Sequence, residues 1–471
     1  MRILAALLLL LTLAAPAQTK KPAHKPAAAQ PEELKFVLIL SRHGIRPPLQ
    51  TTKTIDQYST DPWPEWEVAL GELTPHGAIA LQQMGQYLRL RYVEDGLLPP
   101  GGCPAPGDLY LYADTDHRNI DSTRATFAGF APNCDHLDID MMAPNTSGIR
   151  DPLFNTVPGT FAPPPAAAAE AALRAELRPT PEIALSARAN PELNELAHIL
   201  APDPAHPPAK PILTQPVSFS PGTYGVSARG PLPAASSLIE DLELEYIDAK
   251  PLSQVGWGRV GVTDEAADAA LLRLLPLHVK AFALGLRTPL YARAQGSSLL
   301  SHILSTLKQE EASAKYLLPN VNGQTSYSES DTFKRIHSEN PGAIGPPQTK
   351  LVYLSGHDSN IFTLGGLLGL HWRADSRSDD TPPDSQLAFE LWQQPGHADY
   401  NIRIVYRAQT LAQLRSAETL SLEHPPAEVV LTPTGCVAHK PCPLATFLAA
   451  AARAIDPAFV KPDLVPVTLA P

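Results

Sequence analysis

The sequence has few of the residues that build metal centres and no excess of positive charge. Its 471 residues include four cysteines but no Cys-x-x-Cys pair and no His-Glu-x-x-His motif, so no sequence pattern indicates a metal site. Lysine and arginine total 37 against 48 aspartate and glutamate residues, a formal net charge of −11. That balance argues against a nucleic-acid-binding surface, and it requires that any anionic ligand be held by a local arginine cluster.

Long apolar runs are also scarce. After the first residues, no segment offers the roughly 18 consecutive apolar residues of a transmembrane helix, so we expect no membrane partner. The N-terminus has the features of an export signal: Arg2, an apolar run over 3–13 and a small-residue cleavage site before Gln18. We therefore predict a signal peptide at 1–17, a Pro-, Ala- and Lys-rich leader at 18–33, and a soluble, periplasmic or secreted mature protein.

The cysteines agree with export. An even, small number in an exported chain favours disulfide bonds over buried free thiols. Four cysteines allow three connectivities, and the two natural pairs are Cys103 with Cys134 and Cys436 with Cys442.

Three short, continuous apolar runs, at 36–40, 109–113 and 351–354, predict buried parallel strands. Each is followed by polar residues and then by a predicted helix. Because ligands bind outside the carboxyl ends of strands in open α/β sheets, these strands should deliver Arg, His and Asp side chains to one sheet edge. Strand-like segments at 386–392 and 400–406 predict a hairpin, which makes the sheet mixed.

We therefore predict an α/β fold with a mixed, mainly parallel central sheet flanked by helices. The region between the second and third strands differs in character, since it is loop-rich over 156–235 and mostly helical by pattern over 236–308. A chain of this length favours two domains. We expect an α/β catalytic domain over 34–155 and 311–471, with a mostly helical domain inserted at 156–310.

The first predicted strand runs into the segment Arg42-His43-Gly44-Ile45-Arg46-Pro47-Pro48. Arginine offers a planar fork of donors that suits a phosphate dianion. A neutral imidazole between two arginines can attack phosphorus while the charge on the oxygens is held, and phosphoryl transfer needs little beyond positioning and electrostatics. Arg118 follows the middle strand, and His357-Asp358 follow the last one.

This segment resembles the Arg-His-Gly-x-Arg-x-Pro signature of the histidine acid phosphatases, branch 2 of the histidine phosphatase superfamily. His357-Asp358 and Arg118 resemble the family's distant His-Asp pair and third arginine. Further landmarks resemble the bacterial periplasmic group of phytases and glucose-1-phosphatases: Trp63-Pro64-Glu65-Trp66, Leu73-Thr74-Pro75, Asp151-Pro152-Leu153-Phe154-Asn155, Gly256-Trp257-Gly258 and Thr381-Pro382-Pro383. The cysteines also fall where that group places two disulfides, which implies the pairs Cys103–Cys134 and Cys436–Cys442.

The resemblance implies a two-step reaction. His43 attacks the phosphomonoester and becomes a phosphohistidine, which water then hydrolyses. Asp358 protonates the leaving alcohol, which implies an acidic optimum. The phosphoryl oxygens are held by Arg42, Arg46, Arg118 and His357. We expect no metal and no cofactor, a small phosphate monoester as partner, and a monomer.

The substrate is less constrained. The phytases of this group follow the signature with a Thr-Lys pair, where this chain has Leu49-Gln50 and offers only Lys53 nearby. They also carry an arginine at the position of Gln295. Fewer cations should weaken binding of a polyanion more than binding of a sugar monophosphate. We therefore predict activity on small monoesters such as glucose 1-phosphate, with phytase activity as the alternative.

Two other classes compete. A cofactor-dependent phosphoglycerate mutase also begins with Arg-His-Gly, but the export signal and the Arg46-Pro47 and His357-Asp358 features speak against it. A non-catalytic phosphate-ester-binding protein would be expected to have lost His43 or Asp358, and both are present.

Overall fold

The computed structural model describes residues 31–134, 137–142, 150–155, 164–178, 180–186, 190–222, 225–317, 329–461 and 466–469. The predicted signal peptide and the leader up to residue 30 lie outside the described residues.

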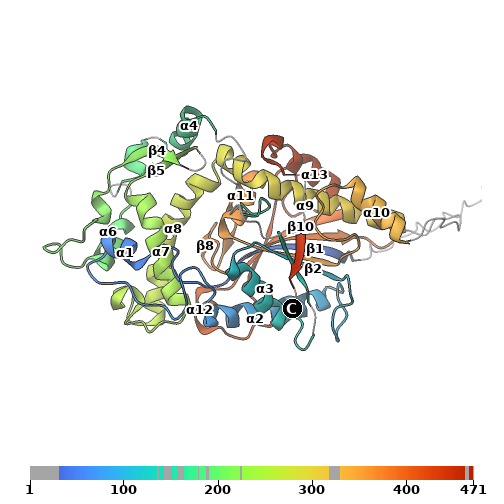
Figure 1. Cartoon of the computed structure of the whole chain (residues 1–471), viewed down its shortest axis with the longest axis horizontal. Helices are drawn as coiled ribbons and strands as arrows, with labels where there is room; N and C mark the ends of the chain where they lie inside the picture. The colour runs from blue at the N-terminus through green and yellow to red at the C-terminus, as the bar shows by residue number, and fades with distance from the viewer. Residues whose placement is uncertain are drawn as a thin grey trace, which may run out of the picture. The chain divides into compact units, whose positions relative to one another are not determined.

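A mixed sheet forms the centre of the fold (Figure 1). Within the described residues it has nine strands: β1 (Glu33–Arg42), β2 (Leu109–Ala113), β3 (Ile139–Met142), β6 (Leu351–Gly356), β9 (Gln386–Gln393), β10 (Tyr400–Ala408), β11 (Ala427–Leu431), β12 (Cys442–Pro443) and β13 (Pro466–Leu469). The strand order is β11-β10-β9-β1-β6-β2-β3-β13, and β12 pairs with β10. The four strands β1-β6-β2-β3 are parallel, and β9, β10, β11 and β13 are antiparallel to their neighbours. The predicted fold class and the β9–β10 hairpin are therefore confirmed.

Helices surround this sheet and fill the segment between β3 and β6. They are α1 (Thr52–Ile55), α2 (Pro75–Glu94), α3 (His117–Phe130), α4 (Ala166–Glu176), α5 (Pro181–Ala184), α6 (Glu192–Leu200), α7 (Pro231–Ile247), α8 (Asp264–Leu286), α9 (Pro289–Leu317), α10 (Glu329–Glu339), α11 (Asp358–Leu368), α12 (Leu411–Ser416) and α13 (Leu444–Ala452). Two small hairpins join β4 (Ser218–Gly222) to β5 (Gly225–Arg229) and β7 (Arg373–Ala374) to β8 (Arg377–Ser378).

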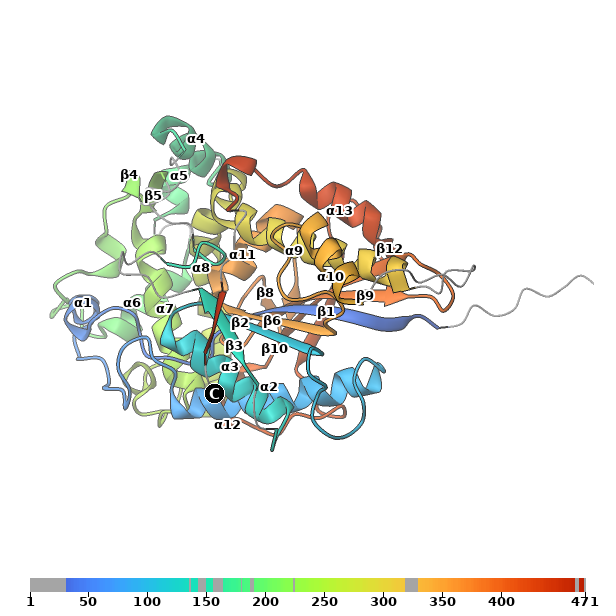
Figure 2. The ribbon, with the colours of Figure 1, turned by 45° about the vertical axis from the view of Figure 1, so that its right-hand side comes forward.

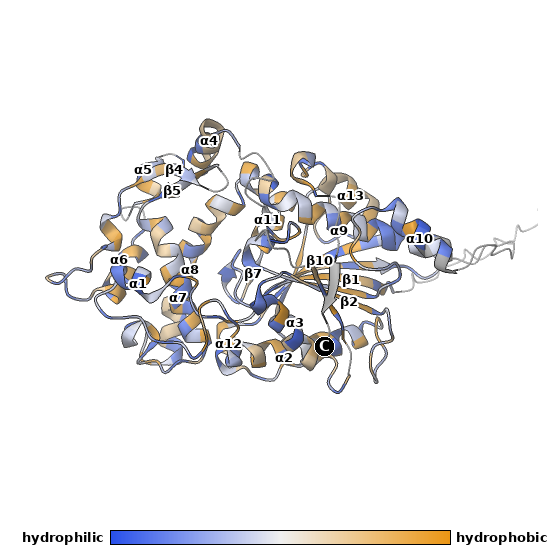
Figure 3. Cartoon of the chain, in the orientation of Figure 1, coloured by the Kyte–Doolittle hydropathy of each residue, from blue (hydrophilic) through white to orange (hydrophobic). Residues whose placement is uncertain are grey.

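The sheet is buried on both faces, which explains why its central strands are continuous apolar runs. Along β1, Leu38 and Leu40 point into a core shared with α9, α11 and α13. Val37 and Ile39 point into a second core shared with α2 and α3. Figure 2 shows these helix groups on opposite faces of the sheet, and Figure 3 shows hydrophobic residues along the strands between them.

A third core lies mainly among α4, α6, α7 and α8. It supports the proposal of an inserted helical domain over 156–310, although contacts join Glu32–Pro471 into one compact unit. Helix α9 crosses the proposed boundary, and its Leu300 and Leu304 pack on the sheet core. We therefore propose that α9 belongs with the α/β part.

Among the described helices, α8 is long and apolar enough to span a membrane by length and composition. Several of its apolar residues, among them Leu271 and Leu274, are fully buried in the third core. Packing in that core accounts for part of the apolar character of this helix.

Both predicted disulfides are present. Cys103 is bonded to Cys134, and Cys436 is bonded to Cys442, with Cα–Cα distances of 5.6 and 5.5 Å. The first joins the loop before β2 to the segment after α3. The second closes the short loop that leads into β12. Each bond thus cross-links a loop next to the sheet.

Glycine sets the approach of α2 to α3. A Cβ atom added to Gly85 would lie 1.8 Å from the backbone oxygen of Thr126, and one added to Gly129 would lie 1.9 Å from that of Gln82. Glycine in a helix destabilises it, because it loses more backbone entropy on folding than other residues. Here the absence of a side chain allows the backbones of the two helices to touch.

We predict that Gly85→Ala destabilises the protein by about 1–3 kcal/mol, because the methyl group overlaps backbone that cannot rotate away. Gly285→Ala is the matched control, since a Cβ there meets nothing within 4 Å. The control should leave stability unchanged or raise it by up to about 1 kcal/mol. Urea unfolding of both variants measures the difference, and equal stability of the two would contradict the packing role of Gly85.

Candidate active site

Three neighbouring parallel strands bring the predicted site together. In the register of β1, β6 and β2, Arg42 lies opposite Gly356 and Ala113 lies opposite Ser355. The ladder continues one residue further, where His43 N donates to Gly356 O at 3.0 Å and Asp114 N donates to Ser355 O at 2.9 Å. The carboxyl ends of these strands therefore carry the predicted site residues on one sheet edge.

His43 is buried, and its ring has a defined hydrogen-bond arrangement. Its Nδ1 lies 2.9 Å from the carbonyl oxygen of Gly44, so Nδ1 carries the hydrogen and Nε2 keeps a free lone pair. Burial, followed by the charges of Arg118, Arg42 and Arg46, holds the pKa of His43 well below its usual value. The imidazole is therefore neutral in acid, which is the form that can act as a nucleophile.

Arg42 and Arg46 flank this ring with buried guanidinium groups. Arg42 donates Nη1 to Thr381 O and Nη2 to Glu240 Oε1, both at 2.5 Å, and Arg46 Nη2 lies 3.1 Å from the same Glu240 oxygen. Burial opposes ionisation of Glu240, but Arg46 and Arg42 lower the pKa of this carboxyl to about 2. One carboxylate thus neutralises part of the charge of two arginines.

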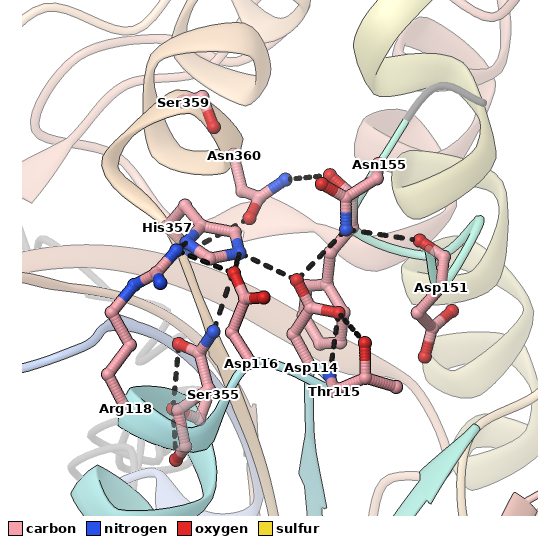
Figure 4. Close-up of polar contacts among 12 residues, drawn as sticks. Asp114, Thr115, Asp116, Arg118, Asp151, Asn155, Ser355, His357, Ser359 and Asn360 are labelled. Carbon is pink, nitrogen blue, oxygen red and sulfur yellow. Dashed lines mark hydrogen bonds and ion pairs between the residues drawn. The ribbon is translucent and has the colours of Figure 1, made fainter. Parts of the chain in front are cut away.

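Arg118 and His357 approach from α3 and β6 (Figure 4). Arg118 Nη2 donates to Asp116 Oδ2 at 2.6 Å and lies 3.5 Å from His357 Nδ1. The rings of His43 and His357 are 5.6 Å apart between centroids and inclined at 72°. Arg118 and both histidines therefore surround the same small space.

Asp358 opens α11 and completes this group. Its Oδ2 lies 3.0 Å from Arg42 Nη2, and its Oδ1 accepts the backbone N–H of Ser359 at 2.6 Å. Asn360 supports the turn, because its Oδ1 accepts from His357 N at 2.8 Å and its Nδ2 donates to Phe154 O at 2.7 Å. The structure thus brings together all six predicted site residues, and their chemical roles remain proposals.

Gly44, which follows His43, has a packing role. A Cβ added to Gly44 would lie 2.6 Å from Leu81 Cδ1 and 2.7 Å from Leu73 Cδ1. A side chain at this position would push the His43 loop away from α2. Its small size therefore keeps His43 in place.

Sequence reasoning missed two groups that contact the site. Glu240 contacts both signature arginines from α7, about 200 positions along the chain. The only available signal was the density of carboxylates, Glu240-Asp241 with Glu243 and Glu245, in an otherwise apolar helix. Asn155 donates to Asp114 Oδ2 at 2.9 Å, and nothing in its local sequence indicated that contact.

Three potential metal ligands also meet here. Oxygen and nitrogen atoms of Asp114, Asp116 and His357 lie within 4.8 Å of one another. Each already has a protein partner: His357 bonds Asp114, and Asp116 bonds Arg118. The cluster is therefore satisfied as a hydrogen-bond network, and we assign it no metal.

The relatives of this chain define its class, which is a histidine-type phosphoric monoester hydrolase. The chain belongs to the histidine phosphatase superfamily (branch 2), whose family model matches residues 33–200 and 267–407. It is 33% identical over 439 residues to phytase AppA of Escherichia coli, covering 89% of this chain and 92% of that protein. It is 28% identical over 422 residues to the glucose-1-phosphatase of Salmonella typhimurium, covering 88% and 91%.

Solved structures agree with the sequence relatives. The apo form of Hafnia alvei phytase superposes with a TM-score of 0.75 at 30% identity, covering 93% of this chain and all of that one. The phytase of Citrobacter braakii gives a TM-score of 0.74 at 28% identity. The relatives thus include both phytases and glucose-1-phosphatases, so the family is established and the substrate needs a separate argument.

We predict that His43 stays neutral at about pH 5, where an ordinary histidine is protonated. Histidine-selective ¹⁵N spectra should contain one imidazole with the Nδ1–H pattern at that pH, and His43→Ala should remove this signal. The remaining histidines of the same sample serve as the internal reference. Finding the His43 signal fully protonated at that pH would contradict the effect of burial and the three arginines.

Proposed function

We propose that this protein is an exported acid phosphomonoesterase that hydrolyses small phosphate monoesters, such as glucose 1-phosphate, through a phosphohistidine on His43. The observation that carries the proposal is the free Nε2 of a buried, neutral imidazole surrounded by Arg42, Arg46, Arg118 and His357. The two disulfides and the predicted signal peptide support a periplasmic or secreted location. We propose a monomer.

In the first step, His43 Nε2 attacks phosphorus and the bond from phosphorus to the alcohol oxygen breaks. Asp358 transfers its proton to that oxygen, so a neutral alcohol leaves and the carboxyl becomes a carboxylate. In the second step, water attacks the phosphohistidine, its proton returns to Asp358, and inorganic phosphate is released. The arginines neutralise charge on the three transferred oxygens throughout.

Acidic conditions suit both reacting groups. The general acid must carry its proton into the first step, which low pH favours. The nucleophile must at the same time stay unprotonated, and the depressed pKa of His43 permits this. Because burial and the surrounding arginines lower the pKa of His43, Asp358 can be protonated and His43 unprotonated in the same acidic pH range.

The surroundings of the site favour a leaving group with little charge. Glu240 places a carboxylate beside Arg42 and Arg46, and this charge would repel further phosphates on the substrate. Leu49 is exposed, and Gln295 donates its amide to Gly285 O. Neither supplies a cation for a polyanion such as phytate.

A cavity of about 370 Å³ lies beside α7, α8 and α9. The residues that line it include Ser236, Phe282, Tyr291 and Gln295 but no basic side chain. Phe282 packs edge-on against Phe362, with ring centroids 4.9 Å apart, and Phe362 lies one helical turn after Asp358 on α11. Ser236 lies one turn before Glu240 on α7. This space suits a neutral sugar or similar alcohol.

Two other functions compete with this proposal, and the experiment below distinguishes them from it. A phytase is supported by the relatives that carry that name. A non-catalytic phosphate-ester-binding protein would use the same arginines without turnover. The presence of both His43 and Asp358 at the site favours catalysis.

The decisive test is phosphate release by the purified mature protein from about pH 3 to about pH 7, without added metal. Glucose 1-phosphate, phytate and a chromogenic phosphomonoester are compared, with His43→Ala as the blank. We expect acidic activity that the variant lacks, with glucose 1-phosphate preferred over phytate. No release from any substrate would replace the enzyme proposal with the binding-protein alternative.

We further predict that Gln295→Arg raises the ratio of kcat/KM for phytate to that for glucose 1-phosphate by about tenfold, the effect of roughly 1.4 kcal/mol of added charge attraction. Gln295→Met, similar in size and uncharged, is the control and should leave the ratio near wild type. If the two variants had the same ratio of kcat/KM values, residue 295 would not contact the leaving group of the substrate.

A further inference from the structure

We propose that Asp114 is the positioning residue for His357: its buried carboxylate accepts the N–H of ring atom Nε2 and so fixes the orientation and the tautomer of this ring. The inference rests on the proposed function, in which His357 binds a phosphoryl oxygen. It adds a residue that acts through His357 without contacting the substrate.

The contact between the two residues is short and buried. His357 Nε2 lies 2.6 Å from Asp114 Oδ2, and the Asp114 side chain is 2% exposed (Figure 4). Two further donors hold the carboxylate: Asn155 Nδ2 at 2.9 Å on Oδ2 and the N–H of Thr115 at 2.7 Å on Oδ1. Burial opposes ionisation, but the bond and charge of His357, then Asn155 and Thr115, lower the pKa of Asp114. An ionised carboxylate only accepts, so His357 Nε2 must carry a hydrogen.

The other ring nitrogen lies beside a cation of the site. Nδ1 is 3.5 Å from Arg118 Nη2. A ring flipped about its Cβ–Cγ bond would break the bond from Nε2 to Asp114 and move Nδ1 away from Arg118. Asp114 therefore decides which nitrogen of His357 faces this arginine.

Asp114 is the carboxylate best placed to hold this ring. Asp116 lies 3.9 Å from Nε2, but it pairs with Arg118 at 2.6 Å. Asp358 adjoins His357 in the chain, but its carboxylate faces Arg42. The orientation of the His357 ring therefore depends on Asp114.

The surrounding structure holds this pair rigidly. Asp114 follows β2, and its N–H donates to Ser355 O at 2.9 Å on the neighbouring strand. The backbone of His357 is held separately by Asn360, whose amide reaches the turn that carries Asn155. Ring and backbone of His357 are thus fixed by different partners, so loss of Asp114 should free the ring without releasing the backbone.

The test is Asp114→Asn, which keeps the size of the side chain and removes its charge. We expect kcat/KM to fall about 10–100-fold, the range seen when a supporting carboxylate is removed from a functional histidine. Competitive inhibition by vanadate should weaken in parallel, and thermal unfolding checks that the variant folds.

Asp151→Asn is the matched control. Asp151 is equally buried, accepts from Tyr112 Oη at 2.8 Å and from Leu153 N at 2.8 Å, and has no contact with His357. We expect it to lower stability and to leave vanadate inhibition near the wild-type level. Vanadate inhibition of Asp114→Asn equal to that of the wild type, or an equal loss in Asp151→Asn, would overturn the proposal.

A second measurement does not depend on turnover. With His357→Gln to assign the signal, ¹⁵N spectra of the wild type should show hydrogen on Nε2 of His357, and Asp114→Asn should weaken the preference for this nitrogen. An unchanged ring in Asp114→Asn would sink the proposal. If the wild type released no phosphate yet its ring behaved as expected, the proposed reaction would fail while the role of Asp114 stood.

Discussion

The arrangement of this protein depends on the burial of several cations around one small space. Arg42 and Arg46 are almost completely buried, and Arg118 and His357 lie close by. Buried guanidinium groups are costly unless carboxylates pair with them. Each of these arginines accordingly has an acidic partner: Glu240 and Asp358 for Arg42, Glu240 for Arg46, and Asp116 for Arg118. The ring of His357 bonds the carboxylate of Asp114. The site is thus held ready for an anion by ion pairs within the protein.

The same charges act on His43. Its ring has no acidic partner among the described residues, and its Nδ1 bonds the neutral carbonyl of Gly44. Burial and three arginines act against protonation and hold the pKa of His43 well below its usual value. The two histidines of the site thus have opposite environments, one surrounded by cations and the other bonded to a carboxylate. Such opposed environments support the different roles that we propose for the two rings.

Ion pairs also join parts of the chain that are far apart in sequence. Glu240 belongs to α7 and the third core, whereas its arginine partners follow β1. Phe282 of α8 packs on Phe362 of α11, the helix that Asp358 opens. These contacts bring acidic and apolar groups of the helical part close to the cationic sheet edge, which supports the proposal of a phosphate ester of a neutral alcohol.

Local patterns were sufficient for the central strands, the hairpin and the site residues at the strand ends. A buried parallel strand is a continuous apolar run, and its C-terminal end is marked by the residues that follow, as with Leu40 before Arg42-His43 and Leu354 before His357-Asp358. The disulfide pairs were likewise foreseen from the position of the cysteines.

Tertiary structure alone decided the partners. Asp114 was visible as a polar residue after a strand, but its bond to His357 arises from the register of β2 on β6, a pairing across more than 200 residues. Glu240 reaches Arg42 through the packing of α7, which no pattern near either residue encodes. A sequence shows which residues end a strand, because burial acts on each strand locally. Which charges meet, and hence which histidine is neutral, depends on distances between strands and helices that only the folded chain defines.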